Sequence, residues 1–230
     1  MNAVDVQGVA KRYARVWALR DITFQIARGE LVCLFGPNGS GKSTLLRILA
    51  TLSRPTRGSA HAVGHSLQTE GDLVRSRIGF LGHRPQVYAE LSAVENLRFA
   101  AVMYGRQAAR PDLRRAVEAV GLGAVADVPV RGYSQGMVQR LALARATLHD
   151  PELLLLDEPF NALDAQGLDI MDRLLDRFAE SDRTVLLATH WLDRVEGRAS
   201  RVLALAAGRL VSDGPFAAAA PDRATRQGAR

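Results

Sequence analysis

The sequence predicts an α/β fold with a mostly parallel central sheet, an antiparallel β element near the N-terminus and a helical subdomain. Residues 31–35, 153–156 and 184–188 are apolar runs without alternation, which is typical of parallel strands buried on both faces. A glycine-rich loop and a helical pattern follow the first run, and the middle of the chain carries apolar residues at helical spacing. With 230 residues, 47% of them hydrophobic, the chain is long enough to bury such a core.

Composition narrows the class of protein. The hydrophobic content, with 23% charged residues, excludes a peptide hormone, a fibre and a disordered tail. The single cysteine, Cys33, allows no intrachain disulfide and no cysteine-based metal site, which fits a reducing compartment. No apolar run approaches the ~20 residues that span a bilayer, so we expect any membrane contact to run through a partner. The formal net charge is +6, and only Lys11 and Lys42 are lysines among the 30 basic residues.

The N-terminal part is predicted to begin with short strands at residues 3–9 and 22–26, before the apolar strand at 31–35. A helix is expected to follow the glycine-rich loop and to stop before the turn-rich residues 54–58. Its apolar residues at helical spacing are Leu45, Leu46, Ile48, Leu49 and Leu52. Residues 77–81 read as another short strand.

Residues 92–121 are predicted to be helical, because Ser92 and Glu95 form a capping box ahead of an apolar helix face. A second amphipathic helix is expected over residues 133–149. After it come three buried-type strands, at 153–156, 184–188 and 201–206, with helical stretches between them. The Ala- and Arg-rich residues 216–230 are predicted to be poorly ordered.

A phosphate-binding loop is the strongest motif in the chain. Residues 36–43 match G-x-x-x-x-G-K-[ST] between a predicted strand and a predicted helix, which is the context that the motif requires. Small residues let consecutive backbone N–H groups turn towards phosphate, and the helix N-terminus adds partial positive charge. Lys42 would bridge the outer phosphates, and Ser43 would ligate Mg²⁺. The predicted ATP-binding residues of this segment are Gly36, Pro37, Asn38, Gly39, Ser40, Gly41, Lys42, Ser43 and Thr44.

An acidic pair, Asp157 and Glu158, follows the apolar run 153–156. The carboxyl end of a buried parallel strand is where ligands bind in such sheets. Asp157 is therefore predicted to hold Mg²⁺, and Glu158 to polarise the attacking water, because phosphoryl transfer depends mainly on positioning and on charge stabilisation.

Five segments resemble the ATPase subunits of ABC transporters. Residues 133–137 with 139–146 look like the signature segment of that family, and Asn161–Asp164 resembles its D-loop. Thr189 and His190 resemble the switch histidine, and Tyr13 matches the aromatic residue that stacks on adenine. The resemblance spans residues 2–214 in the order of the family.

The resemblance implies a P-loop NTPase fold and an ATPase that uses ATP and Mg²⁺. Two domains of the family pair head to tail, so that each ATP lies between one phosphate loop and the partner's signature segment, here Ser134, Gln135, Gly136 and Met137. His190 would act with Glu158 and Lys42 in catalysis, and Asp164 would link the two sites. A single ABC ATPase domain over 2–214 is implied, with a core at about 2–83 and 150–214, a helical subdomain at about 84–149, and a tail at 215–230.

Two departures from the family pattern matter. Gln135 replaces the commoner glycine and Met137 the usual glutamine, a variant that resembles exporters with ABC-2-type membrane partners. The Q-loop glutamine is replaced by His83, whose imidazole lacks the carbonyl oxygen that a hard cation prefers. The predicted metal ligands are thus Ser43, Asp157 and, with this reservation, His83. Gln86 is the alternative residue for the role of the Q-loop glutamine. A further alternative is that His83 and Gln86 are loop residues that face the membrane partner.

The histidine also carries a finer resemblance. Gly82-His83, residues 91–99 and residues 158–164 resemble the ATPase of bacterial haem exporters in cytochrome c biogenesis. This implies a homodimer with a membrane-spanning transporter subunit, at the cytoplasmic face of the bacterial inner membrane, without nucleic acid. Three alternatives remain: another ABC-2-type exporter for a drug, ion or polysaccharide, an ABC ATPase that acts on nucleic acid, and a P-loop kinase or GTPase.

The positive charge is concentrated in two places. Residues 84–115 hold six arginines against three acids, and the tail from residue 216 holds three arginines against one acid. The rest of the chain is almost neutral, with 21 basic and 20 acidic residues left from the totals of 30 and 24. We expect Arg106, Arg110 and Arg114 to face the membrane partner and its anionic lipid surface.

Overall fold

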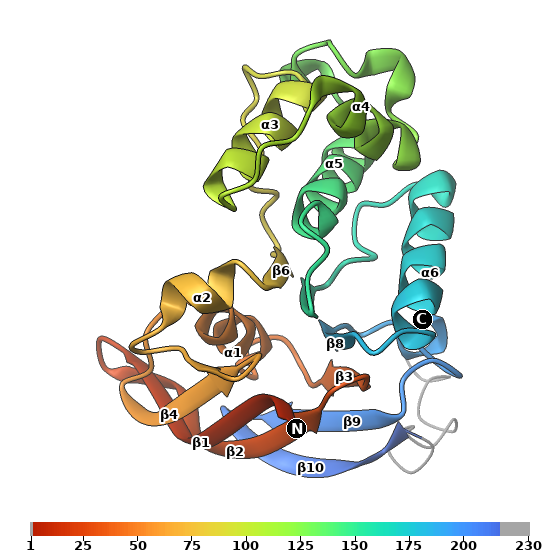
Figure 1. Ribbon diagram of the computed structural model, residues 1–230. Coiled ribbons are helices and arrows are strands. Elements are labelled where there is room, and N and C mark those ends of the chain that lie inside the picture. Colours follow the sequence, from red (N-terminus) through yellow and green to blue (C-terminus); the bar gives the residue numbers. More distant parts are fainter. Residues whose placement is uncertain (1, 217–230) are drawn as a thin grey trace.

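The computed structural model describes residues 2–216, and the strands of this part form two sheets (Figure 1). The first sheet is four-stranded and antiparallel in the order β2-β1-β4-β5. Its strands are β1 (Asn2–Tyr13), β2 (Val16–Ala27), β4 (Arg57–Ala62) and β5 (His65–Ser66). This sheet is the predicted antiparallel element, although β1 and β2 are longer than the expected runs.

The second sheet is six-stranded, in the order β10-β9-β3-β8-β7-β6, and is parallel except between β9 and β10. Its strands are β3 (Leu31–Phe35), β6 (Ile78–Leu81), β7 (Leu153–Asp157), β8 (Thr184–Ala188), β9 (Arg201–Ala206) and β10 (Arg209–Pro215). Ala188 pairs with Asp157 on one side and with Leu34 on the other. The carboxyl ends of β3, β7 and β8 therefore meet at one edge, as the α/β prediction required.

Each face of the six-stranded sheet covers its own hydrophobic core. Along β3, Cys33 faces the core that includes α5 and α6, while Val32 and Leu34 face the core that includes α1. β7 and β8 alternate between the two cores in the same way. This explains the unbroken apolar runs, because a strand covered on both sides has no polar face. Burial raises the pKa of the Cys33 thiol to about 12, with a smaller contribution from Glu158.

The helices lie in separate places around this sheet (Figure 1). Helices α3, α4 and α5 form a group beyond β6, and α6 lies beside them. The bounds are α1 (Lys42–Leu49), α2 (Gly71–Arg75), α3 (Ala93–Met103), α4 (Arg110–Ala119), α5 (Gln135–Thr147) and α6 (Ala165–Ala179), with 3₁₀ turns at Gly123–Val125, Val130–Gly132 and Leu192–Arg194. No helix within residues 2–216 combines the length and apolarity needed to cross a bilayer.

The start of α3 confirms the predicted capping box. The Ser92 hydroxyl accepts from the Glu95 N–H at 3.3 Å, and the Glu95 carboxylate accepts from the Ser92 N–H at 2.8 Å. The two bonds satisfy N–H groups that have no partner within the helix. Hydrogen bonds to the Glu95 carboxylate, first from the Ser92 backbone N–H and then from the Ser92 side chain, lower the pKa of Glu95, so the carboxylate remains charged at neutral pH.

His149 ties the helical group to the six-stranded sheet. Its ring stacks on Tyr104, at the end of α3, with centroids 3.7 Å apart, and its Nε2 donates to the carbonyl of Ile78 on β6 at 2.8 Å. Burial lowers the pKa of His149 to about 4, so the ring is neutral at physiological pH. The contact holds the end of one helix against the first residue of a core strand.

The predicted helical stretch 92–121 forms two helices, because the chain leaves α3 at Tyr104 and re-enters a helix only at Arg110. Gly105 has a φ of 68°, a left-handed conformation that ends the helix, and Pro111 suits the first turn of α4. The turn-rich segment predicted at 54–58 ends earlier than expected, because strand β4 begins at Arg57.

Strand β10 was not expected from the sequence. It returns from β9 through Ala207 and Gly208, whose φ values of 48° and 78° suit a two-residue hairpin turn. Pro215 ends this strand, so the predicted tail at 215–230 begins at least one residue too early. Phe216 packs against the core on the α5 and α6 side, and residues 217–230 lie outside the described part of the chain.

Candidate nucleotide-binding site

The loop between β3 and α1 requires glycine at two positions because the backbone comes close to other segments. Gly36 has a φ of 150°, and a Cβ there would lie 2.2 Å from the Leu205 carbonyl oxygen. Gly41 has a φ of 110°, and a Cβ there would lie 2.6 Å from the Leu19 side chain. Any larger residue would push the loop away from β9 or β2. The glycines therefore set the loop's path at the carboxyl edge of the sheet.

Lys42 is held inside this loop rather than in solvent. Its ammonium donates to the carbonyl oxygens of Gly36 at 2.7 Å and Pro37 at 3.2 Å, and the residue is only 7% exposed. No carboxylate within residues 2–216 forms an ion pair with it. A buried cation with only carbonyl partners is suited to an anionic ligand, because phosphate oxygens would supply the missing charge.

Ser40 supports a phosphate in the same loop. Its hydroxyl is buried and lacks a hydrogen-bond partner, although the residue's backbone N–H donates to Pro37 and its carbonyl accepts from Gly208. A buried polar atom without a partner costs about 1–3 kcal/mol, so a ligand oxygen at this place would remove a penalty. The loop thus fits the phosphate group that the motif predicts.

Ser43 and Asp157 are brought together from α1 and β7. The Ser43 hydroxyl donates to the Asp157 carboxylate at 3.0 Å. Burial, together with the nearby charge of Glu158, raises the pKa of Asp157, and the Ser43 bond opposes this shift. A buried carboxylate beside a hydroxyl provides the oxygen ligands that Mg²⁺ prefers. The two residues fit a shared Mg²⁺ whose remaining ligands would be phosphate oxygens and waters.

His83 lies on the same side of the sheet, after β6. Its charged form lowers the pKa of Asp157, and the side chain lines a cavity of about 370 Å³ together with Glu158 and Gln135. In residues 2–216, however, no group of three or more His, Cys, Asp or Glu side chains is placed to hold a metal. The structure therefore places His83 near Asp157 and Glu158, and a metal-binding role for His83 stays a prediction.

Gln86, the alternative to His83, is directed elsewhere. Its carbonyl oxygen accepts from Arg145 on α5 at 2.9 Å, and its side chain lines a different cavity. Glu158 is absent from the lining of that cavity. Of the two candidates, His83 is the one that shares a cavity with the acidic residue.

Glu158 and His190 meet at the ends of β7 and β8. His190 Nδ1 and a Glu158 carboxylate oxygen lie 2.9 Å apart. The backbone N–H of Glu158 donates to Ala188 at 2.8 Å, and its φ of 51° turns the side chain out of the strand. The Glu158 side chain is 14% exposed and that of His190 58%. A buried carboxylate oriented by a half-exposed histidine is suited to hold a water molecule against a phosphate.

The signature segment begins α5. Ser134 caps the helix by accepting from the Met137 N–H at 3.2 Å, and both Ser134 and Gln135 are exposed. Gly136 is buried, and a Cβ there would lie 3.2 Å from the Ala162 carbonyl in the predicted D-loop. The segment therefore presents a capped, outward-facing helix N-terminus and packs its glycine against the D-loop.

Arg140 connects these two segments and was missed as a functional residue. Its guanidinium donates to the carbonyls of Val120 at 2.9 Å and Gly121 at 3.3 Å, and to the Gln166 side chain at 2.9 Å. It also pairs with Asp164 at 3.4 Å. Asp164 itself caps α6 by accepting from the Gly167 N–H at 2.8 Å. A buried arginine on α5 thus fixes the D-loop aspartate relative to the signature helix.

Tyr13 lies at the end of β1, and within residues 2–216 its side chain forms no hydrogen bond with the phosphate loop. It pairs with Val16 across the hairpin, is 47% exposed, and lies under the Lys11 ammonium at 5.0 Å. Two residues after Val16, the Ala18 carbonyl would lie 2.7 Å from a Cβ at Gly41. The same hairpin therefore carries Tyr13 and borders the loop.

The comparisons with known proteins decide the family. A family model described as ABC transporter matches residues 19–161. The chain belongs to the ABC transporter family. It is an ATP-binding subunit with ATPase chemistry, as the motifs predicted.

Individual relatives carry different functions. The chain is 36% identical over 215 residues to a daunorubicin resistance ATP-binding protein, DrrA3, of Streptomyces coeruleorubidus, covering 93% of this chain and 68% of the relative. It is 40% identical over 204 residues to an aliphatic sulfonates import ATP-binding protein, SsuB 2, of Burkholderia lata, covering 88% and 72%. It is 36% identical over 190 residues to a cytochrome c biogenesis ATP-binding export protein, CcmA 2, of Cupriavidus metallidurans, covering 83% and 89%.

A solved structure confirms the fold. The ATP-binding cassette MJ0796, in a dimeric post-hydrolysis state bound to ADP and Pi, superposes with a TM-score of 0.85 at 28% identity. The match covers 93% of this chain and 98% of that cassette. The α/β ABC ATPase fold is therefore shown, with its antiparallel sheet, its largely parallel sheet and its helical group.

Proposed function

We propose that the chain is the ATPase of a membrane exporter and that it works as a homodimer with two shared ATP sites. The Ser43–Asp157 and Glu158–His190 contacts carry this proposal, because they gather the predicted catalytic groups at the carboxyl edge of one sheet. The proposed domain spans 2–214, with a core at about 2–83 and 150–214 and a helical subdomain at about 84–149. Nucleic acid has no part in this function.

Each residue at this edge has a proposed role. Lys42 contacts the outer phosphates, while the loop N–H groups surround them. Ser43 and Asp157 hold Mg²⁺, which supplies charge neutralisation for the phosphates. Glu158 positions the attacking water, and His190 holds Glu158 and contacts the terminal phosphate. Tyr13 stacks on adenine.

The partner half of each site comes from a second copy. Ser134, with Gln135, Gly136 and Met137, presents a helix N-terminus to the terminal phosphate of the partner's ATP, and the helix dipole favours that negative charge. Asp164 lies beside this segment and links the two sites. The exposure of Ser134 and the dimeric state of the MJ0796 cassette support this arrangement.

A groove between the sheet and α3 is the proposed docking site for the membrane subunit. The groove encloses about 750 Å³, and its apolar residues Leu52, Tyr88, Phe99 and Met103 are each at least 44% exposed. Tyr88 and Phe99 meet edge to face at 5.0 Å. The Asn96 side chain pins the segment before α3 through four hydrogen bonds. An exposed apolar groove of this kind supports contact with a partner protein, and the proposed place of the chain is the cytoplasmic face of the bacterial inner membrane.

Haem for cytochrome c biogenesis is the proposed cargo. The CcmA 2 relative, 36% identical over 190 residues, supports it. His83 beside the acidic pair agrees with the Gly-His resemblance of the Q-loop. A drug exporter of the ABC-2 type is the second candidate, supported by the resemblance to DrrA3 across 93% of this chain.

The Glu158→Gln variant tests the ATPase proposal. Replacing the carboxylate by an amide preserves shape but removes the base, so turnover should fall about 100- to 10,000-fold while ATP affinity is retained. Phosphate release and equilibrium ATP binding measure the two quantities. Unchanged turnover would refute the role of Glu158, and loss of ATP binding would show damage to the loop instead.

The cargo needs a separate test. Deleting the gene should leave apocytochromes c without covalently bound haem, and wild type but not Glu158→Gln should restore them. Haem staining of separated proteins measures this. Normal c-type cytochromes in the deletion strain, with new sensitivity to anthracycline drugs, would favour the second candidate and leave the ATPase proposal standing.

A further inference from the structure

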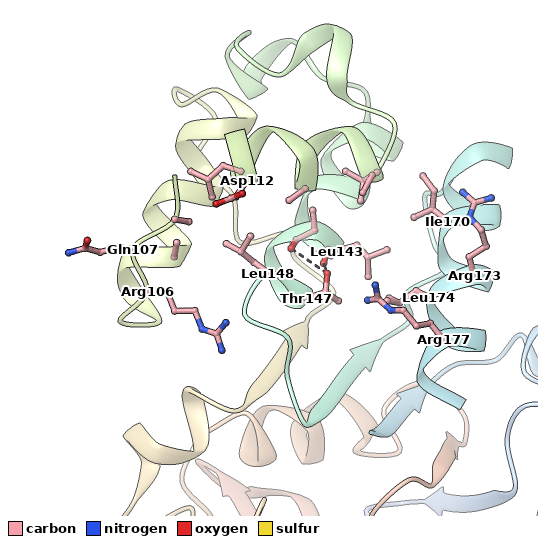
Figure 2. Close-up of a pocket in the computed structure, with 17 residues that line it drawn as sticks. Arg106, Gln107, Asp112, Leu143, Thr147, Leu148, Ile170, Arg173, Leu174 and Arg177 are labelled. Carbon is pink, nitrogen blue, oxygen red and sulfur yellow. Dashed lines mark hydrogen bonds between the residues drawn. The ribbon is translucent and has the colours of Figure 1, made fainter. Parts of the chain in front are cut away.

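A third cavity, separate from the docking groove and from the cavity beside Glu158, encloses about 590 Å³ (Figure 2). Three helices wall it, with α4 and α5 on one side and α6 on the other. The apolar side chains that form the wall are Leu113, Ala116, Leu143, Leu148, Ile170 and Leu174. The volume is within the range of small-molecule pockets, about 300–1,000 Å³.

The rim of this cavity is cationic. Arg106 reaches it from the segment between α3 and α4, and Arg173 and Arg177 reach it from α6. In Figure 2, Arg106 lies on one side of Thr147 and Leu148, and Arg177 lies on the other side, along α6. Asp112 is the acidic residue of the lining, and it pairs with Arg115.

These rim arginines lack the partners that neutralise their neighbours. Within residues 2–216, no carboxylate forms an ion pair with Arg106 or Arg177, and the guanidinium carbon of Arg177 lies 5.9 Å from the centroid of the Phe178 ring. Asp172 and Asp176 on α6 form ion pairs with Arg194 and Arg198. The apolar cavity therefore opens between positive charges that are available to an anion.

We propose that this cavity binds a long-chain carboxylate, with its head group between Arg106 and Arg177 and its apolar chain along α4, α5 and α6. A guanidinium matches a carboxylate with two parallel hydrogen bonds, and the apolar wall removes the chain from water. The chain's own tail is an unsuitable occupant, since residues 216–230 carry three arginines against one acid. This site is independent of the proposed function.

Dodecanoate, kept below micelle-forming concentration, is the probe. Titration calorimetry with the full chain should show one saturable site, and dodecanol should bind at least about tenfold more weakly because it lacks the charge. The double variant Arg106→Gln, Arg177→Gln should lose about tenfold or more in dodecanoate affinity. The control Arg20→Gln, Arg209→Gln removes two exposed arginines elsewhere and should bind like wild type.

Ala116→Trp tests the apolar wall separately. Ala116 is partly buried on α4, and the larger ring should fill the cavity and abolish binding while both arginines remain. Thermal melting checks that this variant is folded, and the arginine variants test the site independently of it. No saturable binding, equal binding of dodecanol, or full affinity in the Arg106→Gln, Arg177→Gln variant would each overturn the proposal. Preference for an acidic helical peptide over dodecanoate would also overturn it.

Discussion

The phosphate loop and the signature segment differ in how much of their chemistry this chain already completes. At the loop, Lys42 and Asp157 are 7% and 2% exposed, and Asp157 is bound to Ser43. At the signature segment, Ser134 and Gln135 are exposed, and the Ser134 hydroxyl is used to cap its own helix. One half-site is enclosed by the sheet edge, and the other points outward.

The phosphate loop and the signature segment are held in place by different kinds of contact. The loop is fixed by close backbone contacts at Gly36 and Gly41, which no second chain needs to supply. The signature helix is fixed by Arg140, which reaches the carbonyls behind it and Asp164 beside it. A rigid but outward-facing helix N-terminus is suited to a ligand held by another molecule.

Lys42→Ala should produce the largest effect, on the enclosed half. Removing the ammonium takes away its charged bonds to phosphate, worth about 3 kcal/mol, so ATP should bind about 100-fold more weakly and turnover should vanish. Equilibrium nucleotide binding measures the affinity. Arg47→Ala, which removes an exposed cation from the same helix, is the control and should bind normally. Normal affinity in Lys42→Ala would contradict the phosphate-loop assignment.

Arg140→Met should produce the next effect, on the outward-facing half. It removes the donor from the buried Val120 carbonyl and from the partly buried Gly121 carbonyl and frees Asp164, which should cost about 2 kcal/mol of unfolding free energy. Urea unfolding measures this. The control Arg115→Met removes an exposed pair with Asp112 and should cost less than about 0.5 kcal/mol. Equal costs for the two variants would show that the Arg140 network does not hold the signature helix.

The sequence predicts the groups at the carboxyl edge of the sheet better than it predicts the contacts that hold the signature helix. The carboxyl-edge groups follow from unbroken apolar strands ending in Asp157, Glu158 and His190, because parallel strands must align their ends. The Arg140 network depends on which helix packs against α5, and local spacing holds no such information. Strand β10 was missed for a similar reason, since its exposed residues show no buried face.

Counting charges along a stretch of sequence misses ion pairs with residues outside that stretch. Arg110 and Arg114 both bond to Asp127 at 2.7 Å, and Asp127 lies outside the stretch whose charge predicted a membrane-facing surface. Those bonds lower the pKa of Asp127 and keep it charged. Of the three arginines expected to face the membrane, Arg106 alone remains without an ion pair within residues 2–216, and it lines the cavity between α4, α5 and α6.

Asp157→Asn should produce the smallest change in stability, and it measures what burial of this carboxylate costs the folded chain. Burial raises the pKa of Asp157 above its ordinary 3.8, so between these two values the folded state keeps a proton that the unfolded chain loses. Stability of the nucleotide-free chain therefore falls as pH rises through that range. Asp157→Asn should melt higher than wild type at neutral pH, and the gap should close below pH 3.8.

Calorimetric melting across pH measures that gap. Ser43→Ala is the matched control, because it removes the bond that opposes the shift and should lower the melting temperature at neutral pH. A gap that widens on acidification would contradict the assignment of burial as the cause. Mg²⁺-dependent turnover should be lost in Asp157→Asn in spite of its higher melting temperature.

The central claim is that the outward-facing helix N-terminus at Ser134 completes a second copy's ATP site. In the Glu158→Gln background, light scattering after gel filtration with ATP should report a dimer, because bound ATP is not consumed. Adding Ser134→Asp keeps the helix cap but places a negative charge against the phosphate, so the dimer should be lost while each monomer still binds ATP. Ser134→Asn, which caps equally well without charge, should remain dimeric. A dimer unaffected by Ser134→Asp, or a monomer in every variant, would contradict the claim.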